Sequence, residues 1–157
     1  MMKGIKKMLV VLAFLAGGIG VASAQNYNTA VGLRFGSYGD GAINLKHMLG
    51  GSNAIEATLG GGRYHLFLEG LYEWNFDLGS GFNWYLGAGA HAFLWNDNHP
   101  VKYYEDGFAL GARGVIGIEY TFDFPLNLAL HTGPRIGIIN GPGYAGWGGS
   151  LAIRYAF

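Results

Sequence analysis

The sequence predicts an all-β fold: an eight-stranded antiparallel up-and-down transmembrane β-barrel, preceded by a cleaved signal peptide. Three observations lead to this prediction. Apolar residues alternate with polar or small ones, at a period of two, in eight separate segments. Glycine occurs 29 times, a density that argues against a helical fold. Charged residues make up only 13% of the chain, about half of the share usual in a soluble domain.

Residues 1–24 are expected to be a signal peptide, and we place the barrel at residues 25–157. Three lysines among the first seven residues precede an apolar run over residues 8–21. Ala22-Ser23-Ala24 then supplies the small-x-small pattern of a signal peptidase site, so we expect cleavage before Gln25. The alternative is an N-terminal membrane anchor, but the apolar run is short for a span of roughly 20 residues.

Charge and cysteine content exclude several classes of protein. Without the three lysines of the signal peptide, seven basic residues oppose ten acidic ones, which gives a net charge of −3. This balance does not provide the basic surface that nucleic acid requires. The chain has no cysteine, so disulfides and thiolate chemistry are excluded. After residue 24 no apolar run approaches the roughly 18 residues that indicate a transmembrane helix.

The first four alternating segments are residues 27–36, 42–49, 54–60 and 64–76. In each of them one face is largely apolar and the other is polar or small, as in a strand that separates two environments. In the first segment the apolar face begins at Tyr27. Residues rich in Gly, Ser, Asn and Asp lie between the segments, so we expect turns there.

The last four alternating segments are residues 82–95, 108–122, 126–138 and 149–157. The apolar face of the seventh segment contains Pro134, which has no N–H to donate, so we expect a bulge or an unpaired position there. The eighth segment has apolar residues at every second position up to its final phenylalanine. The even number of segments suits a barrel whose strands run alternately up and down.

The lengths of the connections give the strands a direction. If both termini face the periplasm, the connections at residues 50–53, 77–81 and 123–125 are the inner ones, and all three are short. The longest connections, residues 96–107 and 140–148, are then on the outer side. Short inner turns and longer outer loops are typical of outer-membrane barrels.

Two kinds of eight-stranded barrel fit this pattern, and they differ in which face is inside. In a soluble, lipocalin-like barrel the apolar face lines the interior and the charged face meets water. In an outer-membrane barrel the apolar face meets lipid and the polar face fills a narrow lumen. Here the polar face is rich in glycine and alanine and carries few, mixed charges, which favours the membrane barrel. The predicted lumen charge network is Arg34, Lys46, Glu56, Glu69, Glu73, Arg113, Glu119, Arg135 and Arg154.

Aromatic residues on the apolar face favour the same interpretation. They cluster near one end of the strands, like the aromatic girdle of a barrel at a membrane interface. A lipocalin interior gives no reason to sort aromatic residues to one end. The predicted inner girdle is Tyr72, Trp74, Phe76, Phe82, Trp84, Tyr120 and Phe122, together with the aromatic residues of the last segment.

A signal peptide, eight alternating segments and a final "SLAIRYAF" together resemble the small outer-membrane barrels related to the OmpA transmembrane domain, OmpX and the opacity proteins. More narrowly, the stretches "YNTAVGLRFG", "NLKHMLGG", "NWYLGAGAHAFLW" and "GVIGIEYTF" are similar to small barrel proteins of the Bacteroidota-type outer membrane. The resemblance covers nearly all of Gln25–Phe157. It implies an outer-membrane location in contact with lipid, and assembly with help from periplasmic chaperones and the barrel-assembly machinery. The residues that match the family's assembly signal are Leu151, Ile153, Tyr155 and Phe157.

The expected function is that of an integral outer-membrane barrel with a lumen filled by ion pairs and a structural or surface-interaction role. Eight strands leave room inside only for side chains, which favours a filled lumen. A narrow channel for ions or small solutes is the alternative. Family membership of this kind transfers fold better than function.

Other candidate sites have weaker support, and no enzyme, metal or cofactor is expected. His65, His91 and His131 share the polar face and raise the hypothesis of a metal site, but interior hydrogen bonding explains such residues more often. A lipid-modifying enzyme needs a nucleophile beside a histidine and a carboxylate. No outward-facing serine–histidine pair appears, and His47 is the sole histidine on the lipid face. The aromatic residues that could bind a partner or sugar, or anchor the outer interface, are Tyr103, Tyr104, Tyr144 and Trp147.

Overall fold

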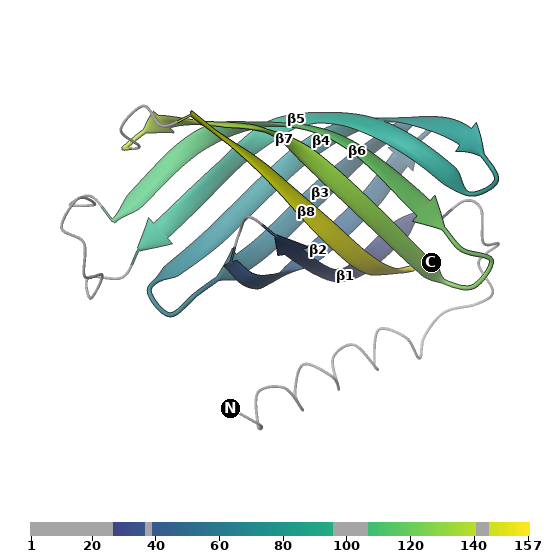
Figure 1. The fold of residues 1–157 in the computed structure, drawn as a ribbon, viewed down its shortest axis with the longest axis horizontal. Coiled ribbons are helices and arrows are strands. Elements are labelled where there is room, and N and C mark those ends of the chain that lie inside the picture. Colours follow the sequence, from purple (N-terminus) through teal and green to yellow (C-terminus); the bar gives the residue numbers. More distant parts are fainter. Residues whose placement is uncertain (1–26, 37–38, 96–106, 141–144) are drawn as a thin grey trace, which may run out of the picture.

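Eight strands form one closed barrel in the structure, a computed structural model that describes residues 27–36, 39–95, 107–140 and 145–157. Each strand pairs antiparallel with its neighbours in sequence, and β1 pairs with β8 to close the ring (Figure 1). The predicted all-β, up-and-down barrel is confirmed, while the predicted signal peptide, residues 1–24, lies outside the described residues. The strands are β1 (Thr29–Gly36), β2 (Gly39–Gly50), β3 (Asn53–Gly61), β4 (His65–Gly79), β5 (Phe82–Trp95), β6 (Phe108–Thr121), β7 (Leu126–Ile139) and β8 (Ala145–Ala156).

Two strands begin earlier than the sequence pattern indicated. β2 begins at Gly39, and β8 begins at Ala145, within the stretch 140–148 that we expected to be a loop. In that stretch Gly146 and Gly148 pair with residues of β7. Glycine-rich sequence is usual in turns, but glycine also leaves space where side chains from the far wall fill a narrow barrel. The β7–β8 connection is therefore shorter than predicted.

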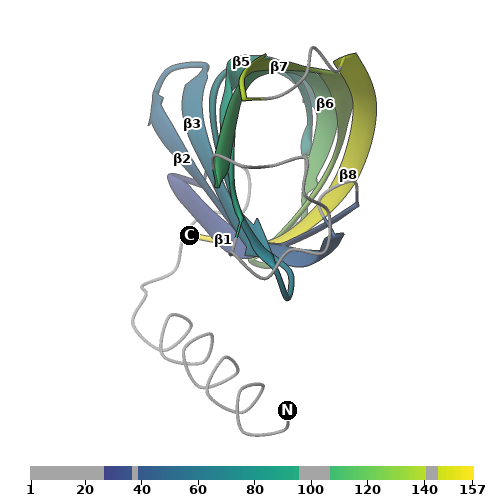
Figure 2. The same ribbon diagram turned by 90° about the vertical axis from the view of Figure 1, so that its left-hand side faces the viewer.

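The two faces of the barrel wall are sorted as the alternation predicts. Outward-facing Ile43, Leu68 and Ile116 are between 41% and 49% exposed. Inward-facing Lys46 and Glu73 are fully buried. Figure 2 views the barrel toward one end and shows the wall that separates these two environments. The barrel thus has an apolar outer surface and a polar interior, the reverse of a soluble protein.

The two ends of the barrel differ in their connections. The end called here the terminal rim holds the three short turns predicted for the inner side, while the opposite rim holds the other four connections. The turn between β4 and β5 has positive φ at three successive residues, with 81° at Gly79, 54° at Ser80 and 85° at Gly81. Glycine adopts positive φ without steric cost, which explains its use here. The terminal rim comprises residues 27–28, 51–52, 80–81, 122–125 and 157.

Pro134 interrupts the pairing of β6 with β7, as expected for a residue without an N–H. The pairs run to Arg113–Arg135 and resume at Ile116–Thr132 without a change of register. No bulge occurs at Pro134, and the register shift of these strands lies instead between Leu110 and Gly111. The carbonyl of Gly133 accepts a hydrogen bond from Nη1 of Arg113 at 2.6 Å, so a side chain takes up an oxygen in the gap.

Candidate functional site

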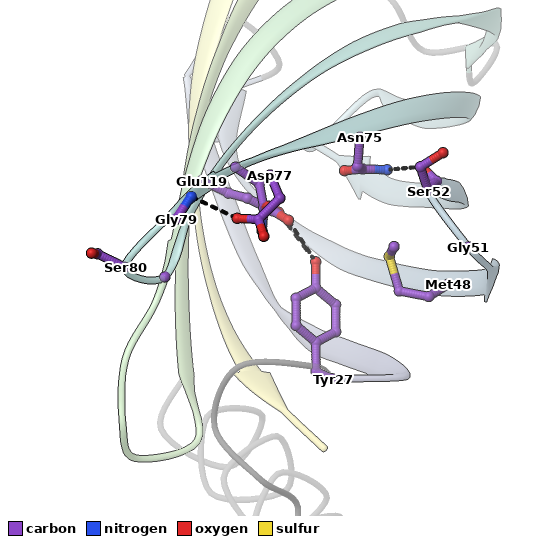
Figure 3. A pocket seen from close by; sticks show the side chains of 11 residues that line it. Tyr27, Met48, Gly51, Ser52, Asn75, Asp77, Gly79, Ser80 and Glu119 are labelled. Atoms are coloured by element: carbon purple, nitrogen blue, oxygen red, sulfur yellow. Dashed lines mark hydrogen bonds between the residues drawn. The ribbon is translucent and has the colours of Figure 1, made fainter.

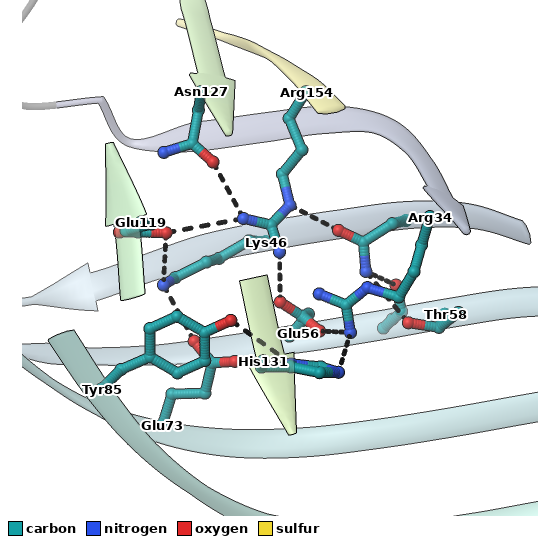
Figure 4. A network of polar contacts seen from close by, with 12 residues as sticks. Arg34, Lys46, Glu56, Thr58, Glu73, Tyr85, Glu119, Asn127, His131 and Arg154 are labelled. Carbon is teal, nitrogen blue, oxygen red and sulfur yellow. Dashed lines mark hydrogen bonds and ion pairs between the residues drawn. The ribbon is translucent and has the colours of Figure 1, made fainter. Parts of the chain in front are cut away.

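The predicted lumen charges all lie on the inner face of the barrel wall, and they form two groups. Eight of the nine are buried, and Arg135 is half-buried. The larger group, called here the inner network, contains three cationic and three anionic side chains, so its formal charges balance. Figure 4 shows these side chains converging from β1, β2, β3, β4, β6 and β8. The inner network is Arg34, Lys46, Glu56, Glu73, Glu119 and Arg154.

Arg154 is the centre of the inner network and reaches four neighbours on four other strands. Its Nη2 lies 2.5 Å from Oε2 of Glu56, and its Nη1 lies 3.5 Å from Oε2 of Glu119. Its Nε donates to Oδ1 of Asn44 at 2.5 Å, and Nη1 donates to Oδ1 of Asn127 at 2.9 Å. A guanidinium has five donors in a fixed plane, so it can join several acceptors that a lysine could not reach together.

Arg34 and Glu56 form the branch of the network beside the β1–β8 seam. Nη1 of Arg34 lies 2.5 Å from Oε1 of Glu56 and 3.0 Å from Nε2 of His131. The second ring nitrogen of His131, Nδ1, lies 3.3 Å from the hydroxyl of Tyr85. Glu56 therefore holds two arginines, one on each of its oxygens.

Lys46 joins the remaining two carboxylates of the inner network. Its Nζ lies 2.9 Å from Oε2 of Glu73 and 3.0 Å from Oε2 of Glu119, and donates to Oδ1 of Asn75 at 2.6 Å. The same ammonium lies 4.4 Å from the centre of the Tyr85 ring, which adds a cation–π contact. Buried charges are tolerated only with such partners, so the network fixes these side chains in place.

The second group of charges lies nearer the opposite rim. Nε of Arg113 lies 3.6 Å from Oε2 of Glu69. The guanidinium of Arg135 lies 5.7 Å and 5.9 Å from the ring centres of Phe67 and Phe93. These rings occupy the inside of the barrel beside the arginine, as expected for a lumen filled with side chains.

Tyr27 was predicted on the apolar face, and this prediction is wrong. The residue precedes β1, is only 8% exposed, and its hydroxyl donates to Oε1 of Glu119 at 3.0 Å. Alternation assigns a residue to a face only while the strand continues, and the strand begins at Thr29. The side chain of Tyr27 lies inside the end of the barrel and contacts Glu119 of the inner network.

Replacing Tyr27 by phenylalanine is expected to lower the free energy of unfolding by about 1.5–3 kcal/mol, the usual worth of a hydrogen bond to a charged group. Urea titration of the barrel in lipid vesicles measures the change. Tyr72→Phe is the matched control, because the Tyr72 hydroxyl accepts its bond from Asn53 in an exposed position. Equal losses in the two variants would show that the buried contact of Tyr27 has no special weight.

A polar cavity of about 370 Å³ opens at the terminal rim next to this contact (Figure 3). The β2–β3 and β4–β5 turns form two of its sides, and Tyr27 and Glu119 also line it. Asn75 and Asp77 supply further polar atoms to its lining. Because Glu119 also contacts Lys46 and Arg154, the cavity borders the inner network.

The predicted girdle residues lie on the outer surface near the terminal rim, and their rings touch across strands. The ring centres of Phe76 and Trp84 are 4.4 Å apart, and those of Phe82 and Tyr120 are 4.5 Å apart. Rings two positions apart in the chain are neighbours as well: Tyr72 lies beside Trp74, and Tyr120 lies beside Phe122. The residues of the proposed assembly signal share this outer face: Leu151 and Ile153 are exposed, and Tyr155 and Phe157 are half-buried.

The backbone of Phe157 pairs with β1 although it follows the end of β8. Its N–H donates to the carbonyl of Thr29 at 2.8 Å, and its carbonyl accepts from the N–H groups of Asn28 and Thr29. The last residue of the chain therefore takes part in closing the barrel.

The histidines do not come together at a metal site. His131 contacts Arg34 of the inner network, His91 stacks on Phe67 with ring centres 6.3 Å apart, and His65 lies beside Phe93. Within the residues that the structure describes, no group of three or more His, Asp or Glu side chains is arranged to hold a metal ion.

The hydroxyl–histidine pairs of the barrel do not form a catalytic triad in the described part of the chain. His47 has Thr29 as a partner, with Nδ1 2.9 Å from its Oγ1, a pair that the sequence did not indicate. Ser150 lies opposite His131 across β7 and β8, but both ring nitrogens of His131 already face Arg34 and Tyr85.

None of the described residues forms a helix long and apolar enough to cross a membrane.

Of the aromatic residues predicted for the outer connections, only Trp147 is within the described part of the chain. It is 72% exposed on β8, and its indole N–H donates to Oγ1 of Thr132 at 2.7 Å. Tyr103, Tyr104 and Tyr144 lie outside the described residues.

Comparison with known proteins supports the fold. The chain is similar to the crystal structure of the N-terminal β-barrel domain of Pseudomonas aeruginosa OprF, with a TM-score of 0.63 and 14% sequence identity. The match covers 85% of this chain and 100% of that one. At this identity the likeness shows a shared eight-stranded barrel and not a shared role. No protein-family model and no curated protein sequence matches the chain.

Proposed function

We propose that the chain is an integral outer-membrane β-barrel whose lumen is closed by buried ion pairs and whose role is structural or lies in interactions at the cell surface. The observation that carries this proposal is the reversed distribution of polarity. Large apolar side chains cover the outer surface, while arginine, lysine and glutamate fill the inside. A lipid environment makes this arrangement favourable, because in water the large apolar outer surface would stay in contact with solvent at a high cost in free energy.

The aromatic rings near the terminal rim support a membrane position. Indole and phenol rings are most stable where hydrocarbon meets the polar headgroups. Phe76, Trp84 and Tyr120 would lie at the periplasmic interface if both termini face the periplasm. The short turns at the same rim fit this orientation.

The closed lumen is supported by the inner network and by its aromatic neighbours. Lys46, Glu73 and Tyr85 are fully buried and meet inside the barrel. A narrow channel for ions or small solutes remains the second candidate, because the cavity at the terminal rim reaches Glu119. The proposal includes no catalytic step.

Assembly would follow the route of other outer-membrane barrels. In this proposal, periplasmic chaperones carry the chain, and the barrel-assembly machinery recognises Leu151, Ile153, Tyr155 and Phe157 on the last strand. The outward direction of Leu151 and Ile153 is compatible with such recognition.

Two measurements test the proposal. A folded barrel purified in detergent is expected to change its gel mobility after boiling, because the intact barrel resists the detergent. In planar bilayers the same protein is expected to give no stable conductance.

The variant K46A/E73A removes a balanced buried pair and its volume, and we expect it to conduct more than the wild type. Stable conductance of the wild type would favour the channel, and a mobility that does not change on boiling would contradict the barrel.

A further inference from the structure

An apolar groove of about 490 Å³ runs along the outer wall close to the opposite rim. It spans β1 to β4, and Phe35, Ile43, Leu59 and Leu66 are among the side chains that line it. All four of these side chains face outward and are partly exposed. The groove therefore lies on the surface that the proposed function places in lipid.

Glycines form part of the groove lining, among them the three successive residues Gly60, Gly61 and Gly62. Gly41 has a φ of 130°, a conformation that residues with a side chain rarely adopt. At Gly61 an added Cβ would lie 2.7 Å from the carbonyl oxygen of His65, so that position has no room for a side chain. Glycine backbone therefore lines part of the recess, beside the side chains of Phe35, Ile43 and Leu66.

A basic side chain stands beside the end of this groove. Arg63 lies in the β3–β4 connection, between Gly62 and His65, which both line the groove. Its guanidinium lies 5.4 Å from the ring centre of Tyr64, and the residue is exposed. Among the described residues that connect strands, Arg63 is the one basic residue, and acidic Asp123 lies at the terminal rim.

We propose that the groove and Arg63 together bind a phosphate-bearing lipid of the outer leaflet, with an acyl chain in the recess and the phosphate at the guanidinium. This inference rests on the proposed function, which puts the opposite rim at the outer interface. The positive charge of Arg63 attracts the anionic phosphate of such a lipid. An acyl chain matches the recess because its lining is largely apolar.

The test uses the full chain folded in bilayers of neutral phosphatidylcholine that contain diphosphoryl lipid A, followed by mass spectrometry of the lipids that the detergent-released barrel retains. A second preparation contains lipid A from which both phosphates have been removed. We expect the wild type and Arg63→Lys to retain lipid A, and Arg63→Gln to retain about fivefold less, the effect of one basic residue near an anionic lipid. The dephosphorylated lipid is expected to be retained as weakly by the wild type as lipid A is by Arg63→Gln.

A second pair of variants tests the groove itself. Ile43→Trp places a larger side chain at the recess and is expected to reduce retention of lipid A. Leu68→Trp, on the same outer face but not in the groove, is expected to leave it unchanged. Retention that is equal with and without phosphates, or equal in all variants, would overturn this inference. The boiling test on each sample keeps the two proposals apart, because a barrel that inserts normally but shows no preference for phosphate contradicts only the lipid site.

Discussion

Replacing Glu56 by glutamine is expected to lower the free energy of unfolding of the barrel by about 3–5 kcal/mol, the cost of breaking a buried ion pair on one side only. Glu56 is 2% exposed and holds Arg34 and Arg154, each at 2.5 Å. Glutamine preserves the shape of the side chain but leaves two buried guanidinium groups without their shared carboxylate. Urea titration in lipid vesicles, followed by gel mobility, measures the loss.

Glu73→Gln is the matched control for this prediction. Glu73 is also fully buried, but its ion pair is with Lys46, which keeps Glu119 and Asn75 when Glu73 is neutralised. We expect a loss of no more than about 1.5 kcal/mol. The double variant R34Q/E56Q is expected to lose less free energy of unfolding than the sum of the losses of the single variants R34Q and E56Q, because contacting residues are coupled. Simple additivity would show that Arg34 and Glu56 are not coupled.

Gly89→Ala is expected to destabilise the barrel by about 3 kcal/mol or more, at the upper end of what overpacking costs. A Cβ at this position would lie 1.9 Å from the carbonyl oxygen of Gly70 and 2.9 Å from Cα of Leu71. These are backbone atoms of the neighbouring strand β4, so no side-chain rotation can relieve the contact. The strands would have to separate at a point where they are hydrogen-bonded.

The control for this substitution lies on the adjacent strand. An added Cβ at Gly70 would meet nothing within 4 Å, so Gly70→Ala is expected to change stability by no more than about 0.5 kcal/mol. The two variants add the same methyl group to the same part of the wall. Similar stabilities, measured by the same titration, would contradict the close approach of β4 and β5.

The alternation of residues was sufficient to predict the strands, their number and their faces. Leu68 and Glu69 fall on opposite sides of the wall because successive side chains of a strand point in opposite directions. Tyr27 was misplaced because alternation contains no signal for the residue at which a strand begins. The glycine-rich start of β8 was misread as a loop because glycine serves both turns and crowded interiors.

The partners within the interior could not be predicted in the same way. Contacts such as Glu56 with Arg154, or Lys46 with Glu119, join strands that are not neighbours in the barrel wall. Which residues meet across the lumen depends on the tilt and stagger of the strands, which the pattern of a single strand does not contain. The sequence therefore predicted which charges are inside but not which of them pair.

The position of Arg154 has a consequence for the order of events in folding. Its partners Asn44 and Glu56 lie 110 and 98 residues earlier in the chain, yet all three are buried together. Until β8 arrives, Glu56 has only one of its two guanidinium groups, and Asn44 and Asn127 lack the donor that joins them. Contacts of such long range form late, since the cost of closing the loop must be met first. The last strand thus both closes the wall and neutralises the interior. Before it is in place, the inner network has one more negative than positive charge, and its polar groups still need water as a partner.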